Sequence, residues 1–248
     1  MKLKTEREIK ILREGGKRLA HVIGVVAQAV APGVATAELD AIAEREINRL
    51  DCRPAFKGYS GYPATACVSV NNQVVHGIPQ ADIFLETGDI VGIDLGLVYE
   101  KLYTDMALTV PVGVVSDRAA QLIDATRIAL ERGIAAAQPG GRVGDIGHAV
   151  ESYATSRGFS VVRQLVGHGV GYQVHEPPQV PNYGRSGTGP ELAPGLVIAI
   201  EPMLNLGTAD VETLEDGWTI VTTDGEWSAH FEHTIAITRQ GPLIITAP

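Results

Sequence analysis

The sequence predicts an α+β fold in which helices cover an antiparallel sheet and two similar halves form an internal pseudo-two-fold repeat. Two patterns carry this prediction: a repeat at an offset of 107 residues, and helical segments that alternate with short apolar strands. The composition agrees, because 45% hydrophobic and 20% charged residues are typical of a globular chain. We expect a single domain over residues 1–248, with halves at about 1–112 and 113–248.

The first expected element is an amphipathic helix within the first 30 residues. Apolar residues from Ile9 to Val30 recur at helical spacing, which predicts a helix lying on a core. A secretory leader ending at residues 35–37 is the alternative, but three glutamates precede the apolar stretch and Pro32 interrupts it. No run approaches the roughly 18 apolar residues of a membrane span. We expect neither a leader nor membrane attachment.

A Pro-Gly pair follows this helix and returns in the second half. Pro32-Gly33 recurs as Pro139-Gly140, and each pair separates an alanine-rich helical segment from a second helix. The same offset places Asp94 on Glu201. Each half therefore predicts two helices, a glycine-rich irregular stretch and then strands, with an acidic residue at the end of an apolar strand.

The last strands of the two halves also correspond, but at another offset. Residues 105–110 match residues 232–237 at an offset of 127, so the second half holds about 20 additional residues. Turn signals at Asp216-Gly217 and Asp224-Gly225 predict that these residues form hairpins.

Carboxylates lie at the ends of these apolar strands, where burial is costly. A hairpin with its turn at Tyr99-Glu100 would place Asp94 opposite Asp105, where like charges repel. Glu201 and Glu232 hold equivalent positions in the other half, and halves folded face to face would bring all four carboxylates together. These strands offer no group of nearby Lys or Arg, so the sequence predicts that something positive binds between the carboxylates.

Two divalent cations would balance four carboxylates without raising their pKa values. His168 is the candidate nitrogen ligand, because its flanking glycines allow close approach and argue against a helix. His76 and His175 lie in irregular stretches, where functional groups are often carried. A lone histidine is more often a hydrogen-bonded structural residue, so the ligand role depends on the whole constellation. Such an oxygen-rich site favours manganese, iron or cobalt, with zinc as an alternative.

Charge and cysteine content restrict the partners. The formal net charge is −9, so the chain lacks the general basic field that holds DNA or RNA. The first 18 residues carry seven Lys or Arg against three Glu, which is either a solvated helix face or a docking patch for an anionic partner such as the ribosome. Cys52 and Cys67 cannot form a disulfide framework and fit a reducing compartment, so we expect a cytoplasmic location. Nothing in the sequence requires more than a monomer.

Taken in order, these residues resemble a known family. Asp94, Asp105, the Gly-His168-Gly segment, Ile200-Glu201-Pro202-Met203 and Glu232-His-Thr are similar to the dinuclear metal set of the methionine aminopeptidases, which have the pita-bread fold. The similarity extends to residues 58–63, 75–79 and 216–219, and so covers nearly the whole chain. The length resembles that of the type I subclass.

The resemblance implies a role for each residue. Asp94 would chelate one metal, Asp105 and Glu232 would bridge both, and His168 with Glu201 would complete the other, with a bridging hydroxide as nucleophile. Glu201 would also carry the proton to the leaving amine. His76 would lie near the leaving nitrogen and His175 near the developing oxyanion. The wall of the methionine pocket would comprise Tyr59, Tyr62, Cys67 and Trp218, although Cys67 equally suits a small buried apolar position.

The implied reaction is removal of the initiator methionine from nascent proteins, with a preference for a small second residue. Three departures from the family pattern affect specificity: Val174 replaces a common aromatic and predicts a wider or less selective pocket, Gly96 replaces a common Thr, and Ser60 replaces a frequent His. Two other interpretations remain: a proline-specific aminopeptidase or prolidase of the same fold, and a non-catalytic peptide-binding module, which would be expected to lose metal ligands.

Overall fold

The computed structural model describes residues 1–248 and contains four α-helices, a nine-stranded sheet and two three-stranded sheets. The helices are α1 (Glu6–Gln28), α2 (Thr36–Arg49), α3 (Asp117–Ala136) and α4 (Val143–Ser156), with a 3₁₀ helix, η1, at Tyr59–Gly61. The strands of the first half are β1 (Arg53–Pro54), β2 (Ala66–Val70), β3 (Gln73–Val75), β4 (Ile90–Tyr99) and β5 (Leu102–Pro111). Those of the second half are β6 (Ser160–Val161), β7 (Gly167–Gly169), β8 (Glu176–Val180), β9 (Val197–Ile200), β10 (Met203–Asn205), β11 (Val211–Thr213), β12 (Ile220–Thr222), β13 (Ser228–His230), β14 (Glu232–Thr238) and β15 (Gly241–Ile244).

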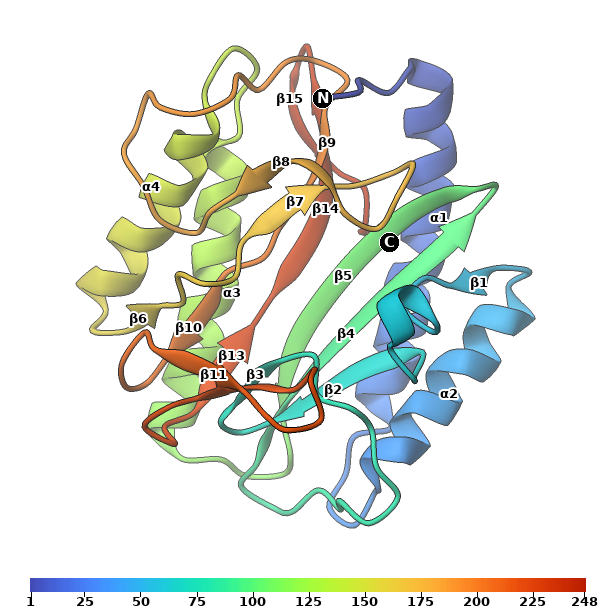
Figure 1. Ribbon diagram of the computed structural model, residues 1–248, viewed down its shortest axis with the longest axis vertical. Helices are drawn as coiled ribbons and strands as arrows, with labels where there is room; N and C mark the ends of the chain where they lie inside the picture. The colour runs from blue at the N-terminus through green and yellow to red at the C-terminus, as the bar shows by residue number, and fades with distance from the viewer.

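The two halves share one plan, which confirms the predicted repeat. Helices α1 and α2 lie toward one side of the molecule and α3 and α4 toward the other (Figure 1), and the pairs pack against different strands of the long sheet, α1 and α2 against β2 and β4, α3 and α4 against β9 and β14. Gly33 and Gly140 both turn the chain with a positive φ, 86° and 80°. The Gly33 N–H donates to the carbonyl of Leu85, and the Gly140 N–H donates to that of Leu192. Donor and acceptor are therefore both displaced by the 107-residue offset.

Helix α1 begins where the sequence provides a cap and buries one apolar stripe. The Thr5 hydroxyl accepts the N–H of Glu8, whose carboxylate accepts the N–H of Thr5, so the first turn is satisfied reciprocally. Leu19, Val22 and Val26 of the stripe pack in a core with apolar residues of α2, β2 and β4. No helix of the chain is both long and apolar enough to cross a membrane.

The nine-stranded sheet is antiparallel and joins the halves at its centre. Its order is β1-β4-β5-β14-β9-β7-β8, with β2 also paired to β4 and β15 to β14. The pairing of β5 with β14 is the junction between the halves (Figure 1). The predicted antiparallel sheet covered by helices is therefore confirmed.

The predicted register of the first hairpin is wrong by two residues. Asp94 lies opposite Ala107, and Asp105 lies opposite Gly96. The turn is at Glu100-Lys101, where both residues have positive φ values of 45° and 68°. Such a turn normally signals itself by Asn or Gly, and neither is present here. Because side chains alternate along a strand, Asp94 and Asp105 still share one face of the sheet, diagonally rather than face to face.

The offset of 127 for the second arms is also wrong. Ile93 pairs with Leu108 in the first half and Ile200 pairs with His233 in the second, so strand pairing relates β5 to β14 at an offset of 125. The counterpart of Asp105 is then His230, and that of Glu232 is Ala107.

Two threonines at the junction confirm this correspondence. The Thr234 hydroxyl accepts the N–H of Asp105 at 2.9 Å and donates to the Asp105 carbonyl at 2.8 Å. The Thr109 hydroxyl makes the same pair of bonds with His230, also at 2.9 and 2.8 Å. Each hydroxyl bridges a place where the main chains of the two halves do not pair directly.

The additional residues of the second half form one of the two predicted hairpins. Asp216-Gly217 lies in the loop that joins the antiparallel pair β11 and β12, as expected. Asp224-Gly225 is a turn, but it connects β12 to β13, which pair with β3 and β10 respectively. The second hairpin prediction is therefore wrong, because a local turn signal does not specify the strand partner.

Candidate active site

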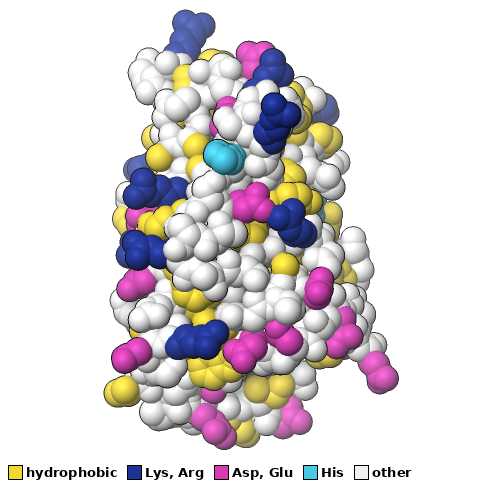
Figure 2. All heavy atoms as spheres, turned by 90° about the vertical axis from the view of Figure 1, so that its left-hand side faces the viewer, with side chains coloured by type: hydrophobic (Ala, Val, Ile, Leu, Met, Phe, Trp, Pro, Cys, Tyr) yellow, Lys and Arg dark blue, Asp and Glu magenta, His cyan; other side chains and the backbone are white.

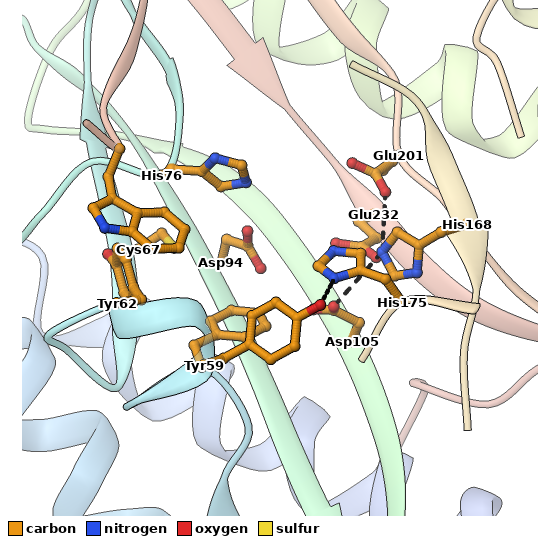
Figure 3. Close-up of a pocket in the computed structure, with 12 residues that line it drawn as sticks. Tyr59, Tyr62, Cys67, His76, Asp94, Asp105, His168, His175, Glu201 and Glu232 are labelled. Atoms are coloured by element: carbon orange, nitrogen blue, oxygen red, sulfur yellow. Dashed lines mark hydrogen bonds and ion pairs between the residues drawn. The ribbon is translucent and has the colours of Figure 1, made fainter. Parts of the chain in front are cut away.

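Three carboxylates project from adjacent strands on one face of the sheet. Asp94 on β4 and Glu232 on β14 both lie opposite Ala107 of β5, and Asp105 is two residues from Ala107 on the same face. The small side chain of Ala107 thus separates two acidic ones. Glu201 follows the last residue of β9 and points into the same space from the other side (Figure 3).

His168 on β7 faces these carboxylates. Its Nε2 lies 3.4 Å from Oε1 of Glu201 and 3.9 Å from Oδ2 of Asp105. Its Nδ1 lies 3.0 Å from the carbonyl oxygen of Gly169, which can only accept, so Nδ1 carries the proton and Nε2 presents a lone pair. Ligand atoms of Asp105, His168 and Glu232 all lie within 4.8 Å of one another.

This donor set fits a cation. The buried atoms Oδ1 of Asp94, Oδ1 of Asp105 and Oε1 of Glu232 have no hydrogen-bond partner. No Lys or Arg lines the cavity that contains them. Buried oxygens normally find a partner, and an imidazole lone pair facing carboxylate oxygens is repulsive unless a positive ion lies between them.

Burial of these groups also shifts their pKa values so that the neutral forms are favoured. Burial raises the pKa of Asp94 to about 7. Burial, then the neighbouring carboxylates, raise the pKa values of Asp105, Glu201 and Glu232 well above their ordinary range. Burial lowers the pKa of His168 to about 4, so this imidazole is neutral at pH 7, as a metal ligand must be. Without a cation the site would retain protons on its carboxyl groups.

An aromatic wall closes the other side of this cavity. Figure 3 shows Tyr62 and Cys67 across the cavity from His168 and Glu201, and Tyr59 extending to His175. Cys67 lies opposite Asp94 in the pairing of β2 with β4, which places it on the site face. All residues predicted to hold metal, to catalyse or to form the pocket line one cavity, together with one that was not predicted, Phe56: Tyr59, Tyr62, Cys67, His76, Asp94, Asp105, His168, His175, Glu201, Trp218 and Glu232.

His76 and His175 line the same cavity as the four carboxylates. Nδ1 of His175 is 2.9 Å from the Tyr59 hydroxyl, and its ring centroid is 4.3 Å from that of His168. His76 has a positive φ of 59°, and its ring is edge-on to Trp218 at 6.3 Å. Burial lowers the pKa of His76 to about 4 and also lowers that of His175.

Local interactions hold the loops that carry these side chains. The Asp216 carboxylate accepts the N–H groups of Trp218 and Thr219, each at 2.8 Å, which shapes the loop that presents the indole. Next to His175, the buried Glu176 carboxylate pairs with Lys4 at 2.8 Å. The N-terminal segment is thereby attached to the His175 loop.

Two residues near the site were missed by sequence reasoning. His230 is buried, its Nε2 has no hydrogen-bond partner, and that atom lies 4.0 Å from Oε2 of Glu201. Phe56 is also buried and lines the cavity, whereas Val174 is buried without lining it. The signal for His230 was its position two residues before Glu232, whereas no sequence signal marked Phe56, whose place depends on the space at Gly96 in the folded chain. Ser60, the third departure, is exposed and lies outside the cavity lining.

Comparison with known proteins agrees with this geometry. The family model of metallopeptidase family M24 matches residues 10–239. Methionine aminopeptidase of Clostridium perfringens is 48% identical over 244 residues, which cover 98% of each chain. Methionine aminopeptidase 1 of Bacillus subtilis is 48% identical over 243 residues, again 98% of each chain.

Solved structures extend the comparison. The crystal structure of methionine aminopeptidase from Thermotoga maritima has a TM-score of 0.98 and 44% identity, with complete coverage of both chains. A prolidase from Pyrococcus furiosus has a TM-score of 0.79 at 23% identity, and this chain covers 65% of it, so that likeness concerns the fold alone. These methionine aminopeptidases are 44–48% identical to the chain over nearly its whole length. The chain therefore belongs to metallopeptidase family M24.

Proposed function

We propose that this enzyme releases the N-terminal methionine of nascent proteins at the cavity where the four carboxylates and His168 meet. The observation that carries the proposal is the set of buried carboxylate oxygens without partners around a neutral imidazole. The similarity of nearly the whole chain to methionine aminopeptidases supports the same substrate class.

The residues would hold two divalent cations. Asp94 would bind one, His168 and Glu201 the other, and Asp105 and Glu232 would bridge them. When bound, such cations lower the pKa of a shared water and polarise the scissile carbonyl. The oxygen-rich donor set favours manganese, iron or cobalt, and zinc is the further candidate.

The side chains around the cations would move protons and bind charge. Glu201 would accept a proton from the attacking water and deliver it to the leaving amine. His76, which is neutral at pH 7 because burial lowers its pKa to about 4, would bind the leaving nitrogen. His175 would hydrogen-bond the developing oxyanion, and its bond to the Tyr59 hydroxyl would orient its ring.

The aromatic wall would accept the methionine side chain. Tyr62 and Trp218 pack edge to face at 5.1 Å, which gives this part of the cavity a fixed shape. With the side chain held there and the α-amine at the cations, cleavage is limited to the chain end. A small second residue would fit best next to the cavity.

We further propose that the enzyme acts as a cytoplasmic monomer on nascent polypeptide N-termini. Both cysteines are free and buried, which suits a reducing compartment. The formal net charge of −9 argues against nucleic acid as a substrate. The face on which α4 lies is consistent with this, since its Lys and Arg side chains form no continuous basic surface (Figure 2). Contact of the basic α1 with the ribosome is a further candidate interaction.

Release of methionine from the peptide Met-Ala-Ser tests this proposal. The assay compares the chelated enzyme with the same enzyme after addition of manganese or cobalt. We expect metal-dependent release of methionine. Cleavage restricted to peptides with proline in second position would support a proline-specific enzyme, and metal binding without any cleavage would support a peptide-binding module.

A further inference from the structure

We propose that Ser69 is a positioning residue for His76, and that it acts by binding the main chain of Gly77, the next residue. The proposal rests on the function proposed above, in which His76 would bind the leaving nitrogen. Ser69 lies on β2 and is buried, but it does not line the cavity. Any effect of Ser69 on the reaction must therefore pass through another residue.

His76 has a backbone conformation that needs support. Its φ of 59° lies in the left-handed region, which residues other than glycine seldom adopt. Five other non-glycine residues of the chain have positive φ values, and none of them lines the cavity. Such a conformation persists only where the surrounding structure fixes it. The groups that bind the main chain next to His76 therefore decide where its ring lies.

Gly77 provides this support through both polar groups of its main chain. Its N–H donates to the Ser69 hydroxyl at 3.1 Å. Its carbonyl accepts the N–H of Val68 at 2.9 Å and the hydroxyl of Tyr62 at 3.1 Å. A Cβ on Gly77 would be 2.4 Å from the carbonyl oxygen of Val68, so a larger residue could not pack this closely on β2. Gly77 is thus fixed against β2, and the residue before it is fixed with it.

The Ser69 hydroxyl takes the place of a main-chain partner. In a regular antiparallel ladder, the N–H of Gly77 would donate to a carbonyl of the neighbouring strand. The N–H of Val70 likewise donates to a side chain, the Oε1 atom of Gln73, at 2.9 Å. Side-chain bonds therefore join β2 to the segment that presents His76. Without the Ser69 hydroxyl, the buried N–H of Gly77 would lose its acceptor, and the backbone at residue 76 could relax.

Three substitutions at position 69 test the proposal in the manganese enzyme with the peptide Met-Ala-Ser. For Ser69→Ala we expect kcat to fall by about 10-fold or more, with KM nearly unchanged, because a misplacement of about 1 Å can cost about 100-fold in rate. Ser69→Cys keeps the shape but accepts only weakly, so its kcat should be intermediate. Ser69→Thr keeps the hydroxyl, and Gly92 opposite residue 69 has no side chain to obstruct the added methyl group, so it should retain the wild-type kcat.

Thr126→Ala is the matched control. Thr126 is also buried, and its hydroxyl donates to the Leu122 carbonyl within α3, so the loss of this hydroxyl should leave kcat unchanged.

A double-mutant cycle separates positioning from a general loss of folding. If Ser69 acts through His76, Ser69→Ala should add little to the loss of kcat that His76→Ala already causes. The crystal structure of Ser69→Ala gives a readout that does not depend on turnover, and residue 76 should leave its positive φ in it. If Ser69→Ala does not fold, Ser69→Cys takes its place in both measurements.

Three results would overturn the inference: a φ at His76 still near 59° in the variant, a wild-type kcat in the variant, or an equal loss of kcat with and without the His76 ring. Absence of methionine release by the wild type would instead contradict the proposed function. The crystal structure of the variant would then still test whether Ser69 holds His76 in place.

Discussion

Asp105 is the side chain through which the two halves share the site. It lies on β5, its main chain is bonded to Thr234 of β14, and its carboxylate faces His168 of the second half. Its role as a bridging ligand would depend on the charge of the carboxylate rather than on the shape of the side chain. Asparagine has nearly the same shape without the charge, so a change to asparagine at position 105 tests the effect of charge alone.

We expect Asp105→Asn to lower kcat/KM by more than about 100-fold. Mutation of a residue that only hydrogen-bonds to a metal ligand already lowers metal affinity or activity by about 10- to 100-fold, and Asp105 would be a ligand itself. The metal-free variant should be at least as stable as the metal-free wild type, since it no longer buries that carboxyl group. Metal content, steady-state kinetics and urea unfolding in chelator are the measurements. Asp124→Asn, on an exposed helix position, is the control. Unchanged metal content and kcat/KM in the folded variant, or a metal-free variant less stable than the metal-free wild type, would contradict the proposed role.

At this scale the sequence predicts the chemistry of the site well and its packing poorly. Asp94 and Glu201 could be found because an acidic residue that ends an apolar strand is unusual and the repeat doubled the signal. Phe56 could not be found in this way, because its place depends on the empty space above Gly96, which is distant in sequence. His230 was missed because the two-residue error in strand offset assigned its place to Glu232.

At the scale of elements, α1 is held against the end of the chain by a glycine contact. A Cβ on Gly16 would overlap the carbonyl of Ile245, whereas nothing lies within 4 Å of a Cβ on Gly24. Both glycines are inside the same helix. Replacement of Gly16 by alanine therefore tests the effect of close packing, and replacement of Gly24 by alanine tests helix propensity alone.

We expect Gly16→Ala to lower the free energy of unfolding by about 1–3 kcal/mol, because the helix must move away from the C-terminal segment. Gly24→Ala should raise it by about 0.5–1 kcal/mol, since alanine loses less backbone freedom in a helix. Chemical denaturation of the two variants measures both values. Equal effects of the same sign would show that the contact with Ile245 does not limit the packing of α1.

The N-terminal segment also holds the loop that carries His175. Lys4 and Glu176 form a buried ion pair at 2.8 Å, with side chains 1% and 8% exposed. Lys4→Met leaves the Glu176 carboxylate buried without its cation, so we expect a loss of about 3–5 kcal/mol in stability and a lower kcat. Lys17→Met is the control, because the Lys17–Glu14 pair is about half exposed and should contribute less than about 1 kcal/mol. A loss no larger than that of the control would contradict the role of Lys4.

The repeat of elements could be predicted from the sequence because both halves contain the same turn and strand-end residues. The Pro-Gly turns and the acidic residues at strand ends recur at the same spacing, so the 107-residue offset can be found without a structure. The register of the β4-β5 hairpin could not be predicted from the sequence, because Glu100 and Lys101 form the turn with positive φ values that these residue types seldom adopt. A register is set by turn geometry and by partner strands, and neither is a local property of the chain.

At the scale of the whole molecule, the metal-free protein should lose stability as the pH rises above about 6.5. The buried carboxyl groups have raised pKa values, about 7 for Asp94, so the folded state keeps protons that the unfolded chain has released, and this stabilisation is lost as pH rises through the folded pKa. The buried histidines act in the opposite direction, but only between their folded pKa, about 4 for His76 and His168, and their ordinary value of 6.5.

Above pH 6.5 the carboxyl groups therefore act alone. We expect the thermal unfolding midpoint in chelator to fall between pH 6.5 and 8, and this fall to disappear with excess manganese, because bound cations take the place of the protons. Unfolding scans across this range with and without metal provide the measurement. A flat or rising midpoint in chelator would contradict the assigned pKa directions.

Anomalous diffraction at the manganese edge, from crystals grown with the ion, tests most directly whether both halves build one dinuclear centre. Two peaks are expected, both in contact with Asp105 and Glu232, one also with Asp94 and the other with His168 and Glu201. A single peak at full manganese occupancy, or peaks away from these side chains, would contradict a shared two-cation site.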